Sequence, residues 1–147
     1  MQEKNTYVIL NTIMIKGISH ITLIVKDIEK TADLFRKLFD VKEIYSSGEN
    51  THSISKEKFF LIHDIWFAIM EGNPFLEKSY NHIAFNISEN DVTEYVKIIT
   101  ELGLETIKDR KRITGEGKSI YFYDYDNHLF ELHTGSLDER LKYYGHL

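Results

Sequence analysis

The run GISHITLIVK at residues 17–26 is the first of two similar segments that divide this sequence into two halves. It is rich in β-branched residues and predicts a strand with His20, Thr22 and Ile24 on one face. A second strand with a histidine near its start, YNHIAFNI at residues 80–87, places that histidine 62 positions after the first (82 − 20 = 62). This recurrence predicts that one supersecondary unit occurs twice in the chain.

Each of these strands is followed by the same order of elements. Asp27 is a candidate N-cap for a first helix, and Ser88 for a second helix that Gly103 ends. Shorter strand candidates then cover residues 41–45, 53–62 and 66–70 in the first half and 105–107, 118–123 and 128–133 in the second. We therefore expect one α+β domain at residues 14–147, made of two βαβββ modules and a short last helix. The expected parts are an N-terminal extension at 1–13, modules at 15–71 and 80–135, and the C-terminal helix at 136–147.

Composition excludes several classes of protein. The 147 residues have a net charge of −5 and no basic stripe with interleaved aromatic residues, which argues against a nucleic-acid partner. Because the chain has no cysteine, a disulfide scaffold, a thiolate metal site and a cysteine nucleophile are all excluded. The apolar runs are shorter than the roughly 20 residues that span a bilayer, and no secretory signal precedes the first strand. We expect a cytoplasmic protein without a membrane partner.

Three residues are candidate metal ligands: His20, His82 and Glu131. Two imidazoles and a carboxylate suit a divalent ion such as manganese, iron or zinc, and three protein ligands leave positions open for a substrate. Each residue alone would more often be a solvated or hydrogen-bonded side chain on a strand, but the repeat-related placement of the histidines favours ligation. If Gly72 is aligned with Gly135, Ala68 falls opposite Glu131, so the first module offers no matching donor.

Five segments carry a resemblance to a known family. They are residues 17–25, 55–62, 80–85, 115–124 and 127–135. They resemble the fosfomycin-resistance proteins of the vicinal oxygen chelate superfamily, and among these the FosX type, which hydrolyses the epoxide. The match runs from Ile15 to the C-terminus. It implies a cupped mixed sheet around Mn2+ or another divalent metal, with the ligands at His20, His82 and Glu131. It also implies a domain-swapped homodimer in which modules of both chains build each site.

The resemblance also assigns roles to other residues. Glu57 falls on the position of the general base that deprotonates the attacking water, although without the resemblance it reads as one charge on a solvated edge. Fosfomycin carries a phosphonate dianion, which needs hydroxyl and cationic donors. The expected substrate-binding residues are Thr22, Lys118, Ser119, Tyr121 and Arg140.

Further polar residues are expected to lie outside the site. We expect Arg112 to be a surface charge. Among the histidines, we expect His52, His63, His128 and His146 on the surface, and His133 beside the ligands at most.

The implied reaction is metal-dependent hydrolysis of fosfomycin to a vicinal diol, giving antibiotic resistance. One alternative is a fosfomycin thiol transferase, which would use cysteine, bacillithiol or glutathione with the same metal. Another is a protein of the same fold that binds a drug without changing it, although sequestration does not need a Lewis acid.

Overall fold

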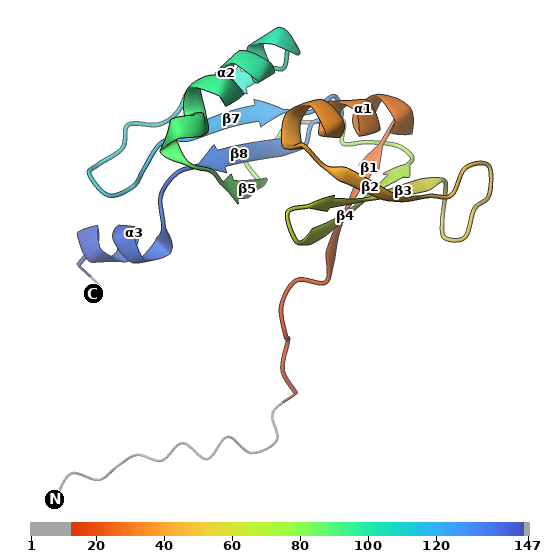
Figure 1. Ribbon diagram of the computed structural model, residues 1–147, viewed down its shortest axis with the longest axis horizontal. Coiled ribbons are helices and arrows are strands. Elements are labelled where there is room, and N and C mark those ends of the chain that lie inside the picture. The colour runs from red at the N-terminus through yellow and green to blue at the C-terminus, as the bar shows by residue number, and fades with distance from the viewer. Residues whose placement is uncertain (1–12, 146–147) are drawn as a thin grey trace, which may run out of the picture.

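The computed structural model describes residues 13–145 and contains two βαβββ modules followed by a short helix (Figure 1). The first module comprises β1 (His20–Val25), α1 (Ile28–Phe39), β2 (Lys42–Ser46), β3 (Glu57–Ile62) and β4 (Ile65–Glu71). The second comprises β5 (His82–Asn86), the 3-10 turn η1 (Glu89–Asp91), α2 (Val92–Glu101), β6 (Thr106–Ile107), β7 (Ser119–Tyr123) and β8 (Leu129–His133), and α3 (Leu137–Tyr143) follows. The predicted α+β class is confirmed. Residues 1–12 of the expected N-terminal extension and 146–147 of the expected last helix lie outside the described residues.

The two modules have the same sheet topology. The strand orders are β1-β4-β3-β2 and β5-β8-β7-β6, with the first pair parallel in each sheet and the other pairs antiparallel. Thr22, two residues after His20, pairs with Ala68, and Ala84, two residues after His82, pairs with Glu131. Ala68 and Glu131 therefore occupy equivalent positions, which confirms the alignment made from the sequence.

Local hydrogen bonds explain where the elements begin. The Asp27 carboxylate accepts a hydrogen bond from the Lys30 N–H at 3.0 Å and caps α1, as predicted. The strand expected at residues 53–62 begins only at Glu57. Its N–H donates to Ser47 Oγ at 2.9 Å, and its carbonyl accepts from the Ser47 N–H at 3.0 Å. These two bonds close the loop before Glu57, and the regular strand starts there.

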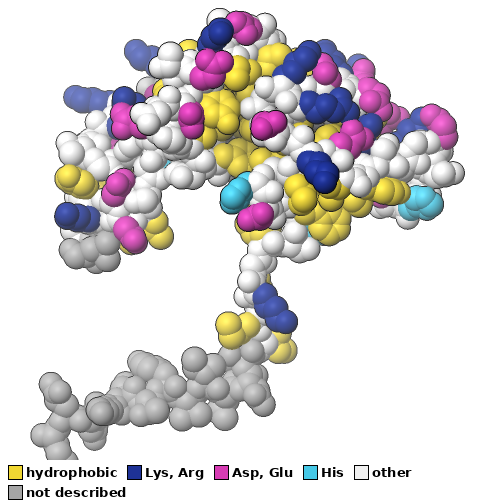
Figure 2. Space-filling view, in the orientation of Figure 1, with side chains coloured by type: hydrophobic (Ala, Val, Ile, Leu, Met, Phe, Trp, Pro, Cys, Tyr) yellow, Lys and Arg dark blue, Asp and Glu magenta, His cyan; other side chains and the backbone are white. Residues whose placement is uncertain are grey.

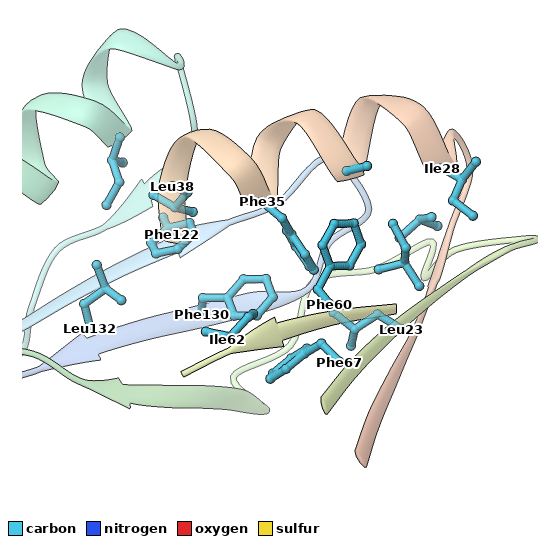
Figure 3. Packing of buried hydrophobic residues seen from close by; sticks show 14 residues of the cluster. Leu23, Ile28, Phe35, Leu38, Phe60, Ile62, Phe67, Phe122, Phe130 and Leu132 are labelled. Carbon is cyan, nitrogen blue, oxygen red and sulfur yellow. The ribbon is translucent and has the colours of Figure 1, made fainter. Parts of the chain in front are cut away.

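One hydrophobic core joins the two modules (Figure 3). Phe35 of α1 is fully buried, and its ring lies within 6.4 Å of Phe60, Phe67 and Phe130, which come from both sheets. Figure 1 shows α1 and α2 together on one side of the sheets. Burial of these large rings against both sheets fixes the modules relative to each other.

The other sheet faces carry the predicted site residues. On β1, His20, Thr22 and Ile24 are exposed, while the alternating Leu23 and Val25 are buried in the core. The same alternation holds along β5, where His82 and Ala84 are on the open side. No helix among residues 13–145 is long and apolar enough to cross a membrane.

Candidate metal and anion site

A cavity of about 500 Å³ opens on the second module. Figure 2 shows the molecule hollowed on this side, between the lobe of α3 and that of the first module. The lining side chains come from β5, β7, β8, α3 and the loop before β7. They include His82, Tyr121, Glu131, His133, Arg110, Arg112 and Arg140. Three guanidinium groups around an imidazole–carboxylate pair make this cavity suited to a cation beside an anion.

His82 and Glu131 face each other at the wall of the cavity. His82 Nδ1 lies 2.7 Å from the Tyr80 carbonyl, which can only accept, so Nδ1 carries the hydrogen and Nε2 the lone pair in the neutral ring. Nε2 in turn lies 2.9 Å from Glu131 Oε2. With Nε2 protonated the contact is an ion pair, and a divalent ion in place of that proton would find an imidazole nitrogen and a carboxylate oxygen side by side, both of them ordinary ligands. The pair fits two ligands of a divalent metal ion.

The second oxygen of Glu131 is held by neighbours on the same sheet. Ser119 Oγ donates to Oε1 at 2.5 Å and also lies 2.7 Å from His133 Nδ1. Burial alone would raise the pKa of Glu131, but hydrogen bonding from Ser119 and Tyr121 outweighs burial and holds the pKa below its ordinary value. Oε1 is therefore occupied within the chain, and Oε2 faces His82.

Arg112 belongs to this network, and its assignment as a surface charge was wrong. Its side chain is only 9% exposed. Nε donates to both carboxylate oxygens of Asp109 at 2.9 and 3.0 Å, and Nη2 donates to the Tyr121 hydroxyl at 3.1 Å. Nη2 also lies 3.6 Å from Glu131 Oε1, and the buried Nη1 has no hydrogen-bond partner among residues 13–145. The positive charge of Arg112 can stay buried because the Asp109 carboxylate forms an ion pair with it.

The structure brings together part of the predicted set. His82, Glu131, Ser119, Tyr121 and Arg140 gather at one cavity. Arg140 reaches it from α3, with Nη2 3.4 Å from His133 Nε2.

Three other predicted residues lie elsewhere, on the first sheet. There His20 and Thr22 share a face, and Glu57 joins them because its partner Met70 also pairs with Ile24. No group of three His, Cys, Asp or Glu side chains within residues 13–145 could hold a metal. A single chain therefore does not gather His20 with His82 and Glu131.

Lys118 is the one expected substrate-binding residue that lies neither at the cavity nor with His20 on the first sheet. Its side chain is 65% exposed, and Nζ forms an ion pair with Glu89 at 2.8 Å. Its binding role stays a prediction that the geometry does not favour.

His128 was also misplaced by the sequence reasoning, which put it on the surface. It is buried at 7% exposure, with Nδ1 2.7 Å from the Asp124 carboxylate. This bond closes the β7–β8 hairpin.

Paired βαβββ modules with an imidazole–carboxylate pair on the open face of a sheet define a class of metalloproteins. The Glyoxalase/Bleomycin resistance protein/Dioxygenase superfamily model matches residues 17–132, and the chain belongs to this family.

Relatives within this family are more specific. The chain is 60% identical over 131 residues to the fosfomycin resistance protein FosX of Listeria monocytogenes, covering 89% of this chain and 98% of the relative. It is 38% identical over 135 residues to the metallothiol transferase FosB of Staphylococcus epidermidis, covering 89% and 92%. A crystal structure of a FosX variant from Listeria monocytogenes, complexed with Mn(II) and 1S,2S-dihydroxypropylphosphonic acid, matches with a TM-score of 0.83 at 56% identity and covers 89% and 99% of the two chains.

Proposed function

We propose that this protein hydrolyses the epoxide of fosfomycin to a vicinal diol in a manganese-dependent reaction and thereby confers resistance. The observation that carries the proposal is the pair formed by His82 Nε2 and Glu131 Oε2, 2.9 Å apart in a cavity that also holds Arg112 and Arg140. The FosX relatives, at 59 and 60% identity, support the same activity.

His82 and Glu131 would hold the metal from the second module, and His20 is the third ligand. When bound, Mn2+ supplies a Lewis acid that polarises the epoxide oxygen. His20 and Thr22 lie exposed on an open sheet face of the first module, so a second copy of the chain can bring them to the cavity. We therefore infer a homodimer with two composite sites, each built from the first module of one chain and the second module of its partner.

Glu57 acts as the general base. It shares a sheet face with His20, is 9% exposed, and its carboxylate accepts no hydrogen bond from another described residue. In the reaction Glu57 takes a proton from water while the water oxygen forms a bond to an epoxide carbon. The carbon–oxygen bond of the ring breaks, and the released oxygen takes up a proton to complete the diol.

The phosphonate would lie at the arginine side of the cavity. Arg140 reaches this side from α3. The charged guanidinium of Arg112 also lines the cavity and donates to the Tyr121 hydroxyl. The Tyr121 hydroxyl remains protonated at neutral pH, because burial first and the hydrogen bond from Tyr80 second raise the pKa of Tyr121 to about 12. Its one hydrogen is directed at Glu131, so Tyr121 would donate to a phosphonate oxygen only after its hydroxyl turns away from that carboxylate.

One experiment tests the reaction. The protein is incubated with Mn(II) and fosfomycin in H₂¹⁸O, with and without thiols, and the products are analysed by mass spectrometry. A diol with one ¹⁸O atom, formed equally with and without thiol, is expected. A thiol adduct would support the FosB activity instead, and unchanged fosfomycin would support a protein that only binds the drug.

A second experiment tests the shared site. His20→Ala and Glu131→Ala should each be inactive as pure proteins. If the ligands come from two chains, co-expression gives mixed dimers that contain one intact and one doubly defective site, so about a quarter of the parent activity should return. No recovery in mixed dimers would show that each site draws its ligands from one chain.

A further inference from the structure

The last helix cannot hold itself in place. α3 has seven residues, too few for a stable isolated helix. Its first turn is closed by a capping box between Ser136 and Glu139, but none of its residues is buried. Contacts outside the helix must therefore decide where α3 lies.

These contacts come from the loop before β7. Glu116 is 4% exposed and accepts hydrogen bonds from both Arg110 Nη atoms at 3.0 Å and from the Ile113 N–H at 2.9 Å. The Tyr144 hydroxyl, just past the end of α3, donates to the same carboxylate.

The neighbouring Tyr143 ring lies against Gly115, where a Cβ atom would meet the ring at 1.8 Å. Gly115 also has a φ of 88°, which favours glycine. The loop is therefore shaped to receive the end of α3, and we call the contacts of Gly115 and Glu116 with Tyr143 and Tyr144 the latch.

The latch acts one helical turn from Arg140. The Tyr144 N–H donates to the Arg140 carbonyl at 2.9 Å, so the backbone of the two residues is joined. Arg140 lines the cavity from α3, while Arg112 lines it from the loop that carries Glu116. We propose that the latch fixes α3 on this loop and so places Arg140 at the anion side of the cavity. Glu116 and Tyr144 are then positioning residues for the substrate's anionic group. This inference rests on the proposed function, because it takes the phosphonate as the ligand of Arg140.

Tyr144→Phe removes the hydroxyl and keeps the ring. In the Mn(II)-loaded full-length protein, KM for fosfomycin should rise about tenfold, the loss expected for one hydrogen bond to a charged group. Because the metal ligands are not touched, kcat and the Mn(II) affinity, measured by electron paramagnetic resonance of free Mn(II), should stay close to the parent values. Hydrogen exchange at the α3 amides should become faster. Tyr125→Phe is the matched control: it removes the hydroxyl of an exposed tyrosine outside this cavity and should leave all four quantities unchanged.

A double variant shows whether the latch acts through Arg140. Once Arg140→Ala has removed the guanidinium, adding Tyr144→Phe should raise KM no further. If the two effects multiply, or if Tyr144→Phe alone leaves KM unchanged, the latch is refuted while the phosphonate site stands. If Arg140→Ala itself leaves KM unchanged, the proposed phosphonate site is wrong and the inference fails with it, although diol formation would still establish the reaction.

Discussion

Replacing Arg112 with methionine should lower the free energy of unfolding by about 3 kcal/mol. Removing one partner of a buried ion pair typically costs about 3–5 kcal/mol. The lower end applies because Asp109, which is 28% exposed, keeps contact with water and with the Ser119 N–H at 3.2 Å. For a chain of this size the loss corresponds to a fall in Tm of about 6–12 °C.

The assay is urea unfolding of the metal-free protein at one fixed concentration, since association would otherwise shift the midpoint. Arg36→Met is the control: its pair with Glu43 is 42% exposed on the arginine side and should contribute less than about 1 kcal/mol. Asp109→Asn combined with Arg112→Met removes both charges and should recover part of the loss. If Arg112→Met costs no more than Arg36→Met, the reasoning about its burial is wrong.

The remaining predictions concern the metal, the base and the latch. His82→Ala removes a ligand and should abolish Mn(II) binding and turnover, and full activity in metal-stripped buffer would contradict this. Glu57→Gln should retain Mn(II) binding but form diol about 10²–10⁴ times more slowly in single turnover, whereas a change of only a few-fold would place the base elsewhere. Hydrogen bonds from Arg110 first, and then from Tyr144, hold the pKa of Glu116 at about 2 against an ordinary 4.5. Its contribution to stability should therefore be complete above pH 4.5 and decline as the pH falls towards 2, a slope that Glu116→Gln should remove.

Much of the fold could be predicted because its signals are local. The alternation around His20 predicted that His20, Thr22 and Ile24 share one face of a strand, and the recurrence of a histidine strand at His82 predicted the second module. The cap at Asp27 followed from the hydrogen-bonding ability of its side chain. The sequence did not predict that the strand starts only at Glu57, because this start depends on a hydrogen bond with Ser47, ten residues earlier.

The site could be predicted only in part. Glu131 and His82 meet because parallel pairing of their strands brings them together, but where His20 lies relative to them depends on how the modules pack. Arg112 was missed because its burial depends on Tyr121 across the loop. One local signal was present, since Asp109 three residues before Arg112 can neutralise it.

The core around Phe35 has a consequence for how the protein can be divided. Although the chain reads as two copies of one unit, the ring of Phe35 needs Phe60 from one copy and Phe130 from the other. Neither half closes its own interior, so fragments cut between β4 and β5, near Pro74, should stay unfolded alone and regain structure only when mixed. The module is the unit of repetition along the chain, and the pair of modules is the unit of cooperative folding.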